Sequence, residues 1–234
     1  MGLKEAGLRG SLRSVSTDVG IPDSVAVQHD ATEEDSTGTI STIEDLVGNF
    51  DLSGSCEVID NGINGLRTYH FDGTDGEFMQ QTSKIADAPD DEPFAFIAVV
   101  ELPRTGTDNI LFDGGNDQNF ILQDNGNDEW RFYRETFSWD DSTTDTVTTD
   151  PSIVELIGDN NDEVFFRVNG GTLRGPNTDS NAGDLTGHTL AKTAGDSRDE
   201  MELDIGQFEI LVDYDEAELT ERREAMADKW EIPI

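Results

Sequence analysis

Short runs of β-forming residues that end in tight-turn sequences constrain the fold of this chain more than any other feature. Eight such runs are rich in β-branched and aromatic residues, and clusters of Gly, Asn or Asp bound each of them. Three of the early and middle turns read Asp-Gly or Asn-Gly, a dipeptide that suits positive φ. Turns this frequent favour an all-β sandwich over an alternating α/β fold. The runs span residues 66–71, 94–102, 109–112, 119–123, 129–134, 153–158, 164–168 and 207–214.

Two of these runs indicate how the layers are covered. Residues 94–101 read Phe-Ala-Phe-Ile-Ala-Val-Val-Glu, so this strand is expected to be covered on both faces. In the last run Phe208 and Ile210 share one face, whereas Gln207 and Glu209 point the other way. That alternation predicts one face in the core and the other in water.

One convincing helix follows the last strand. It is predicted at about residues 220–230, with Thr220 as its N-cap. Met226 and Trp230 are four residues apart and are expected to pack together on the sandwich. With 234 residues, the chain suits one large domain, predicted over residues 30–234, after an extended basic arm over residues 1–29.

The charge balance indicates a protein adapted to very high salt. The chain carries 51 acidic and 15 basic residues, a formal net charge of −36. At about 1 M salt the Debye length is about 3 Å, so these acids no longer repel one another over long distances. Lysine depletion with aspartate excess resembles proteins of halophilic archaea. Such a charge also argues against nucleic acid as a partner.

The sign of the charge reverses at the N-terminus. Three of the 15 basic residues lie within the first 13 positions, against one acid. One reading is a loose terminus. The other is a docking arm that orders on an acidic neighbouring subunit. The residues of this predicted assembly anchor are Lys4, Leu8, Arg9, Leu12 and Arg13.

The sequence argues against several other classes of protein. The single cysteine, Cys56, cannot form an intrachain disulfide or a cysteine metal site and is expected in the core. No run approaches the about 18 to 20 apolar residues of a membrane helix, and no signal-peptide core is evident. Membrane insertion is therefore not expected.

Three stretches of the chain carry a likeness to a known fold family. They are 51–76, which contains Tyr-His-Phe-Asp-Gly, 162–171, which ends in Asn-Gly-Gly, and 205–232, where a strand precedes a helix that ends near Trp230. Together these stretches resemble laminin-G-like, concanavalin A-like jelly-roll domains. The resemblance covers about residues 40–234 and implies two antiparallel sheets in jelly-roll order, often displayed on trimeric spikes, fibres or capsid decorations. The basic leader followed by residues 20–25 is similar to structural proteins of tailed viruses and proviruses of halophilic archaea.

Evidence for catalysis is sparse. His29, His70 and His188 show no metal-ligand spacing, and no Ser or Cys nucleophile elbow is present. The chain is therefore expected not to be an enzyme.

One group of acids still deserves comparison with glycosidases. Glu200, Glu202 and Asp204 alternate on a predicted strand, which spaces their carboxylates by about 6 to 7 Å, within the range of paired glycosidase acids. The pattern is partly similar to concanavalin A-like glycoside hydrolases, but residues 205–207 lack the further acid of that pattern. A chain this acidic also places such residues on any wet face.

Two oxygen-rich loops suit a hard cation. They lack the ligand spacing of an EF-hand, and surface turns carry the same residue types. No cofactor is required, and calcium remains a candidate at Asp113, Asp117, Asp159 and Asp162.

The favoured reading is a virion structural protein of a halophilic archaeal virus, in a capsid turret, a decoration or a tail fibre. It would be made in the host cytoplasm and displayed on the virion surface. Its expected partners are copies of itself, as in a trimer, other virion proteins through the arm, and a host-surface glycan or S-layer. Arg131, Tyr133 and Arg134 are candidates for glycan or interface contact. The alternatives are a lectin-like carbohydrate-binding module and, third, a glycoside hydrolase.

Overall fold

The structure is a computed structural model. It describes residues 23–74, 76–85, 93–102, 109–114, 121–125, 129–133, 142–159, 163–178, 185, 187–191 and 202–234. The five predicted anchor residues of the arm lie outside these ranges.

Within the described part, the chain forms antiparallel strands, two single 3₁₀ turns and one α-helix. Every strand pair is antiparallel. The helix α1 spans Glu216–Trp230, and the 3₁₀ turns η1 and η2 span Ala31–Glu33 and Ile63–Gly65. The strands are β1 Val25–Asp30, β2 Gly38–Ile43, β3 Leu52–Ile59, β4 Thr68–Asp72, β5 Phe78–Gln81, β6 Phe94–Glu101, β7 Asn109–Asp113, β8 Ile121–Asn125, β9 Glu129–Tyr133, β10 Ser142–Thr146, β11 Ser152–Gly158, β12 Glu163–Val168, β13 Arg174–Thr178, β14 His188–Leu190 and β15 Glu202–Val212.

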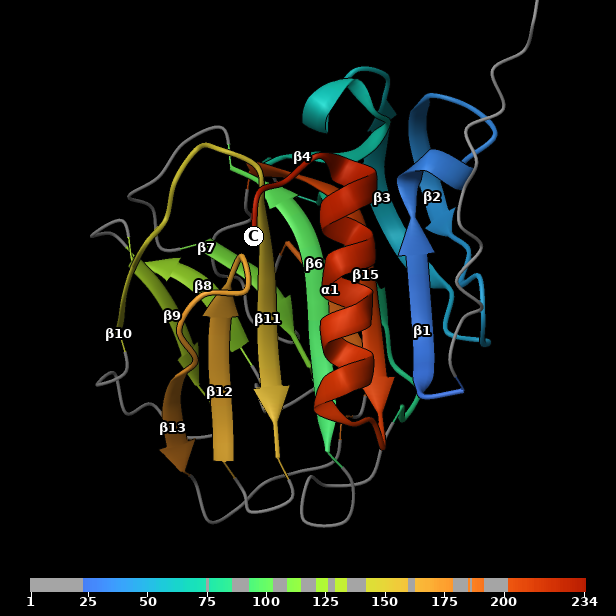
Figure 1. The fold of residues 1–234 in the computed structure, drawn as a ribbon. Helices are drawn as coiled ribbons and strands as arrows, with labels where there is room; N and C mark the ends of the chain where they lie inside the picture. Colours follow the sequence, from blue (N-terminus) through green and yellow to red (C-terminus); the bar gives the residue numbers. More distant parts are fainter. Residues whose placement is uncertain are drawn as a thin grey trace, which may run out of the picture.

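The strands form two packed layers, as the sequence predicted. The front layer runs β15-β6-β11-β12-β13, with β1 and β4 pairing along the other edge of β15 (Figure 1). The second layer runs β10-β9-β8-β7-β14-β5-β3, with β2 beside β3. The two layers join where β3 pairs with β4. The prediction of an all-β, two-sheet antiparallel sandwich with a short C-terminal helix is confirmed.

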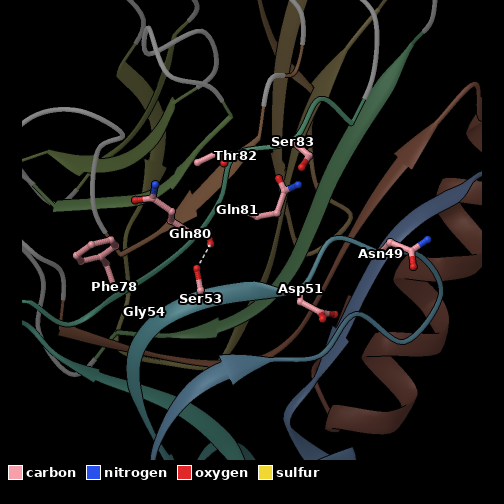
Figure 2. Close-up of a pocket in the computed structure, with 9 residues that line it drawn as sticks. All are labelled: Asn49, Asp51, Ser53, Gly54, Phe78, Gln80, Gln81, Thr82 and Ser83. Atoms are coloured by element: carbon pink, nitrogen blue, oxygen red, sulfur yellow. Dashed lines mark hydrogen bonds between the residues drawn. The ribbon is translucent and has the colours of Figure 1, made fainter.

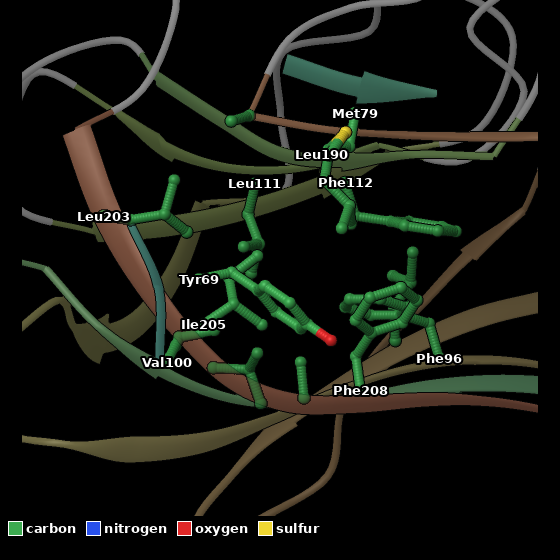
Figure 3. Close-up of a cluster of buried hydrophobic side chains, with 14 of the residues drawn as sticks. Tyr69, Met79, Phe96, Val100, Leu111, Phe112, Leu190, Leu203, Ile205 and Phe208 are labelled. Carbon is green, nitrogen blue, oxygen red and sulfur yellow. The ribbon is translucent and has the colours of Figure 1, made fainter. Parts of the chain in front are cut away.

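The strand β6 lies at the centre of the front layer. Phe94, Phe96, Ala98 and Val100 face the second layer, and the alternate residues 95, 97 and 99 face α1. Both faces of this strand are therefore covered, as its apolar run predicted. Between the layers, aromatic rings from β6, β7 and β15 fill the core (Figure 3), and the rings of Phe96 and Phe112 stack with centroids 4.1 Å apart.

The helix α1 begins four residues before the predicted start. Its N-cap is Asp215, not Thr220, because the Asp215 carboxylate accepts hydrogen bonds from two backbone N–H groups of the first turn, and Glu218 completes a capping box. Met226 and Trp230 are buried, as predicted. The Trp230 ring lies against Gly206, where a Cβ atom would stand 2.5 Å from the ring.

The predicted wet face of the last strand is instead buried beneath α1. Glu209 has no exposed surface, and its carboxylate accepts a hydrogen bond from Nε of Arg222 at 2.7 Å. Gln28 and Gln207 donate to the same carboxylate at 3.1 and 2.9 Å. The prediction was wrong because polar residues on this face meet charged residues of the helix rather than water.

A second buried carboxylate repeats this arrangement. Glu155 of β11 has no exposed surface and accepts hydrogen bonds from Arg167 of β12 and Arg223 of α1, with closest distances of 2.5 and 2.9 Å. Arg167 also donates to Glu216 at 3.0 Å. The helix is therefore held on the sheet by ion pairs as well as by apolar packing.

The N-terminal boundary differs from the predicted one. Residues 25–30 form β1, which pairs with β15, so the sandwich includes residues before position 30. The polar stretch from 30 to 42 contains η1 and most of β2. Cys56 is buried in the core as expected, and burial raises the pKa of its thiol. In the described part of the chain, no helix has the length and apolar character needed to cross a membrane.

Candidate functional site

An open groove of about 520 Å³ lies where β3 and β5 pair in the second layer. We call it the β3–β5 groove. Figure 2 shows Asn49 and Asp51 on one side of it and Phe78 and Gln80 on the other. Its volume falls within the range of sites that hold small ligands, about 300 to 1,000 Å³. The lining residues are Asn49, Asp51, Ser53, Gly54, Phe78, Gln80, Gln81, Thr82 and Ser83.

The loop between β2 and β3, which supplies one wall of the groove, is organised by Asp45. One carboxylate oxygen, Oδ1, accepts hydrogen bonds from the backbone N–H groups of Gln28 and Val47 at 3.0 and 3.2 Å. The other, Oδ2, accepts from Gly48 and Phe50 at 3.0 and 3.1 Å. Four backbone donors on one carboxylate fix the path of this short loop.

The same loop holds Asp51 in place. Its Oδ1 accepts a hydrogen bond from the backbone N–H of Asp45 at 2.9 Å. Its second carboxylate oxygen has no hydrogen-bond partner among the described residues and is available to a ligand. Gly48 is required in the loop, because a Cβ atom there would stand 2.6 Å from the Asp45 carboxylate.

The floor of the groove depends on a glycine in β3. At Gly54, a Cβ atom would stand 2.0 Å from the backbone oxygen of Phe78. Only glycine allows the two strands to approach this closely. The Ser53 hydroxyl reaches across to the backbone oxygen of Gln80 at 3.4 Å, as Figure 2 shows. The groove is thus built on paired strands rather than on free loops.

The polar groups of the groove are rich in unused hydrogen-bonding capacity. Within the described structure, the side-chain amides of Asn49, Gln80 and Gln81 make no hydrogen bond to another residue. Gln81 is only 8% exposed and both polar atoms of its amide are buried, so Asn49 and Gln80 are the amides that a ligand can reach. Phe78 adds a half-buried aromatic ring. This combination offers donors, acceptors and an apolar face, which suits a ligand rich in hydroxyl groups.

Behind the groove, two histidines are buried in the core. Gln81 pairs in register with His188 of β14, and the His188 and His29 rings lie 6.1 Å apart. The Nδ1–H of His29 donates to the backbone oxygen of Glu44 at 2.9 Å, whereas both His188 ring nitrogens lack a partner in the described structure. Burial lowers the pKa of His29 to about 4 and that of His188 to about 3, so both are neutral near pH 7.

A second polar feature crosses the strands β3, β4, β15 and β6. Glu57, His70, Asp204 and Glu101 lie side by side in register. The His70 Nδ1 lies 2.7 Å from Asp204 Oδ1. Burial raises the pKa of Asp204, and burial together with the Asp204 charge raises the pKa of Glu101.

Only part of the predicted hydrolase site can be placed. Glu202 and Asp204 lie on β15, and Glu200 is outside the described ranges. Asp204 already has a hydrogen-bond partner in His70, and neither acid lines the β3–β5 groove. Sequence reasoning placed these acids on one strand but did not identify their histidine partner.

The calcium candidates are only partly described. Asp113 is buried at the end of β7, and Asp159 Oδ1 accepts a hydrogen bond from the backbone N–H of Glu163 at 3.1 Å in the β11–β12 hairpin. Asp117 and Asp162 lie outside the described residues. Among the residues that are described, no group of three or more His, Cys, Asp or Glu side chains is placed to hold a metal ion. Calcium binding stays a prediction.

The predicted aromatic and basic contact cluster lies on a different strand from the groove. Arg131 and Tyr133 belong to β9, but only their backbone is described, and Arg134 is outside the described ranges. The groove itself was missed because neither β3 nor β5 shows a strong β pattern. The signal available was the Asp-Leu-Val-Gly stretch at residues 45–48, which is typical of an Asp-stabilised turn.

Comparison with solved structures finds similar folds in a sialidase and in two toxin binding domains. A mutant of Trypanosoma rangeli sialidase with trans-sialidase activity matches 90% of this chain with a TM-score of 0.65 at 14% identity. The binding domain of Paraclostridial Mosquitocidal Protein 1 matches 86% with a TM-score of 0.62 at 13% identity. The binding domain of botulinum neurotoxin serotype G matches 87% with a TM-score of 0.58 at 11% identity.

These likenesses define the class of fold. The chain spans about a third of the length of the sialidase, 34%, and about half that of the two toxin binding domains, 52% and 51%. At such identities the shared feature is the β-sandwich architecture, as the resemblance to jelly-roll domains implied. No known family profile and no curated protein matches the sequence.

Proposed function

We propose that this chain is a non-catalytic binding module whose β3–β5 groove binds a carbohydrate. The observation that carries the proposal is a groove lined by the half-buried ring of Phe78 and by the side-chain amides of Asn49 and Gln80, which make no hydrogen bond to another described residue. Sugar hydroxyls both donate and accept hydrogen bonds, and sugar C–H faces pack on aromatic rings. The fold neighbours support the proposal, since one is a sialidase and two are toxin binding domains.

A glycan array probed at molar KCl tests the proposal. The wild-type protein is expected to bind a restricted set of oligosaccharides, and Gln80→Ala should weaken binding about tenfold because it removes a donor and an acceptor from the groove. Thr39→Ala is the matched control, since Thr39 is exposed on the neighbouring strand β2 and lies outside the groove. Absence of binding to any glycan, or equal loss in both variants, would contradict a carbohydrate site in the groove.

We further propose that the module works on the surface of a virion of a halophilic archaeal virus, in a turret, a decoration or a tail fibre. The supporting observation is the basic segment at residues 1–13, which precedes a strongly acidic domain. In this proposal the segment docks the module on acidic virion proteins, and the module itself associates as a trimer. Deleting residues 1–22 should prevent incorporation into particles while the sandwich stays folded. Normal incorporation would refute the anchoring role.

The row of polar side chains formed by Glu57, His70, Asp204 and Glu101 provides the test of the non-catalytic proposal. If the protein were a glycoside hydrolase that uses this row, Asp204→Asn would abolish release of reducing sugar from polysaccharides. We expect no release from the wild-type protein. Turnover that disappears in Asp204→Asn would overturn the proposal.

A further inference from the structure

We infer that the β3–β5 groove selects neutral glycans and rejects glycans that carry a carboxylate or a sulfate. The inference rests on the proposed function, because it names the ligand class of the same groove. It separates this chain from what its fold neighbours suggest, since several solved neighbours are sialidases and one is bound to sialic acid, an anionic sugar.

The first argument is the charge of the groove. Asp51 is the one charged residue among the nine that line it, and no lysine, arginine or histidine is present in that set. Anionic ligands are bound in proteins by arginine, lysine or clustered backbone N–H donors. Here a bound anion would instead meet a carboxylate. Coulomb repulsion at contact distance is expected to lower the affinity for such a ligand at least about tenfold relative to a neutral one.

The second argument is the match of donors and acceptors. The amides of Asn49 and Gln80 each offer an NH₂ donor and a carbonyl acceptor, and the second oxygen of Asp51 accepts only. A hydroxyl group can satisfy either kind of partner. A carboxylate or a sulfate can only accept hydrogen bonds. The acceptor atoms of the groove would therefore face the lone pairs of the ligand and remain without a donor. The groove therefore complements a neutral, hydroxyl-bearing sugar.

High salt does not remove this selectivity. At about 1 M salt the Debye length is about 3 Å, so the many distant acids of the chain contribute little to ligand repulsion. Asp51 differs from those acids because it lies in the groove, where a ligand would touch it directly. One residue, rather than the overall charge of −36, is then expected to set the preference.

The experiment uses pairs of oligosaccharides that differ only by a terminal sialic acid. Binding to the full chain is measured by titration calorimetry at molar KCl for each member of a pair. The wild-type protein should bind the neutral member at least about tenfold more tightly. In Asp51→Asn the ratio of the affinities for the neutral and the sialylated member should fall close to one. Binding of the neutral member should be retained, because asparagine keeps the oxygen that accepts from the Asp45 N–H.

The matched control is Glu57→Gln. Glu57 is an exposed carboxylate on the same strand, β3, but outside the groove, so its replacement removes one negative charge without changing the lining. The selectivity ratio should stay at its wild-type value. Equal or tighter binding of the sialylated member by the wild-type protein would overturn the inference, and so would a ratio that Asp51→Asn leaves intact or that Glu57→Gln also abolishes. Failure to bind either member of any pair would instead refute the proposed carbohydrate function.

Discussion

Replacing His188 by leucine should make the folded domain less sensitive to acid. His29 and His188 lie together in the core, and burial lowers their pKa values from 6.5 to about 4 and about 3. Because these folded-state values lie below the unfolded one, the unfolded chain binds more protons in the interval between them. Their contribution to stability is therefore complete above about pH 6.5 and is lost as the pH falls toward the folded values.

The size of the effect follows from the slope of that dependence. Each buried imidazole lowers the free energy of unfolding by about 1.4 kcal/mol per pH unit within its interval, so His188 alone accounts for about 3 kcal/mol between about pH 6.5 and pH 4.5. His188 is the cleaner target, because Asp45 and Asp51 favour the protonated form of His29 and partly offset its burial. The neighbouring group that acts on His188 is His29 itself, and its charge lowers the pKa of His188 further.

Urea unfolding at constant molar KCl measures the effect. The free energy of unfolding of His188→Leu minus that of the wild-type protein should rise by about 3 kcal/mol between about pH 6.5 and pH 4.5. The raised pKa values of Asp204 and Glu101 act in the opposite direction but are common to both proteins and cancel in the difference. Phe112→Leu, which removes packing from the same core without a titratable group, should shift stability equally at each pH. A difference for His188→Leu that does not vary with pH would refute the reasoning.

Three further outcomes are expected. Arg222→Ala leaves the buried carboxylate of Glu209 without its cation and should lower the free energy of unfolding by about 3 to 5 kcal/mol in urea titrations, so a loss below about 1 kcal/mol would contradict the buried pair. Asp45→Ala removes the acceptor of four backbone N–H groups and should abolish glycan binding, while the far-ultraviolet circular dichroism spectrum stays that of the folded β-sheet protein. Unchanged binding would show that the loop does not depend on the Asp45 carboxylate. Dilution from molar salt to about 0.1 M lengthens the Debye length from about 3 to about 10 Å and should lower the melting temperature, and a melting temperature that rises or stays constant would argue against adaptation to high salt.

The fold could be predicted from the sequence where burial imposes a pattern. The apolar run of β6 indicated a strand covered on both faces, and the structure shows the second layer on one side and α1 on the other. The same reasoning failed for Glu209, because periodicity separates polar from apolar faces but does not show what lies opposite the polar one. Arg222 sits 13 residues further along the chain, and only the docking of the helix brings the two together.

The groove could not be predicted in the same way. The strands β3 and β5 contribute Ser53, Gly54, Phe78 and Gln80, which give no regular apolar alternation. Their pairing depends on a contact between residues about 25 positions apart and on the close approach that Gly54 permits. A binding surface made of short polar side chains leaves little trace in a single sequence, whereas a metal or nucleophile site carries residue types that can be recognised.

The pairing of β1 with β15 has a consequence for the order in which the parts of the protein fold. Gln28 and Glu209 are 181 positions apart, yet they share a hydrogen bond beneath α1. The edge of β15 next to β1 forms only after β15 has been synthesised, so β1 stays without this partner while the whole intervening chain is made. Until the two strands pair, the exposed edge of β1 can pair with wrong strands, and it relies on factors of the cell to prevent this. Closure of the front layer is thus expected to be a late step of folding, limited by a contact of long sequence separation.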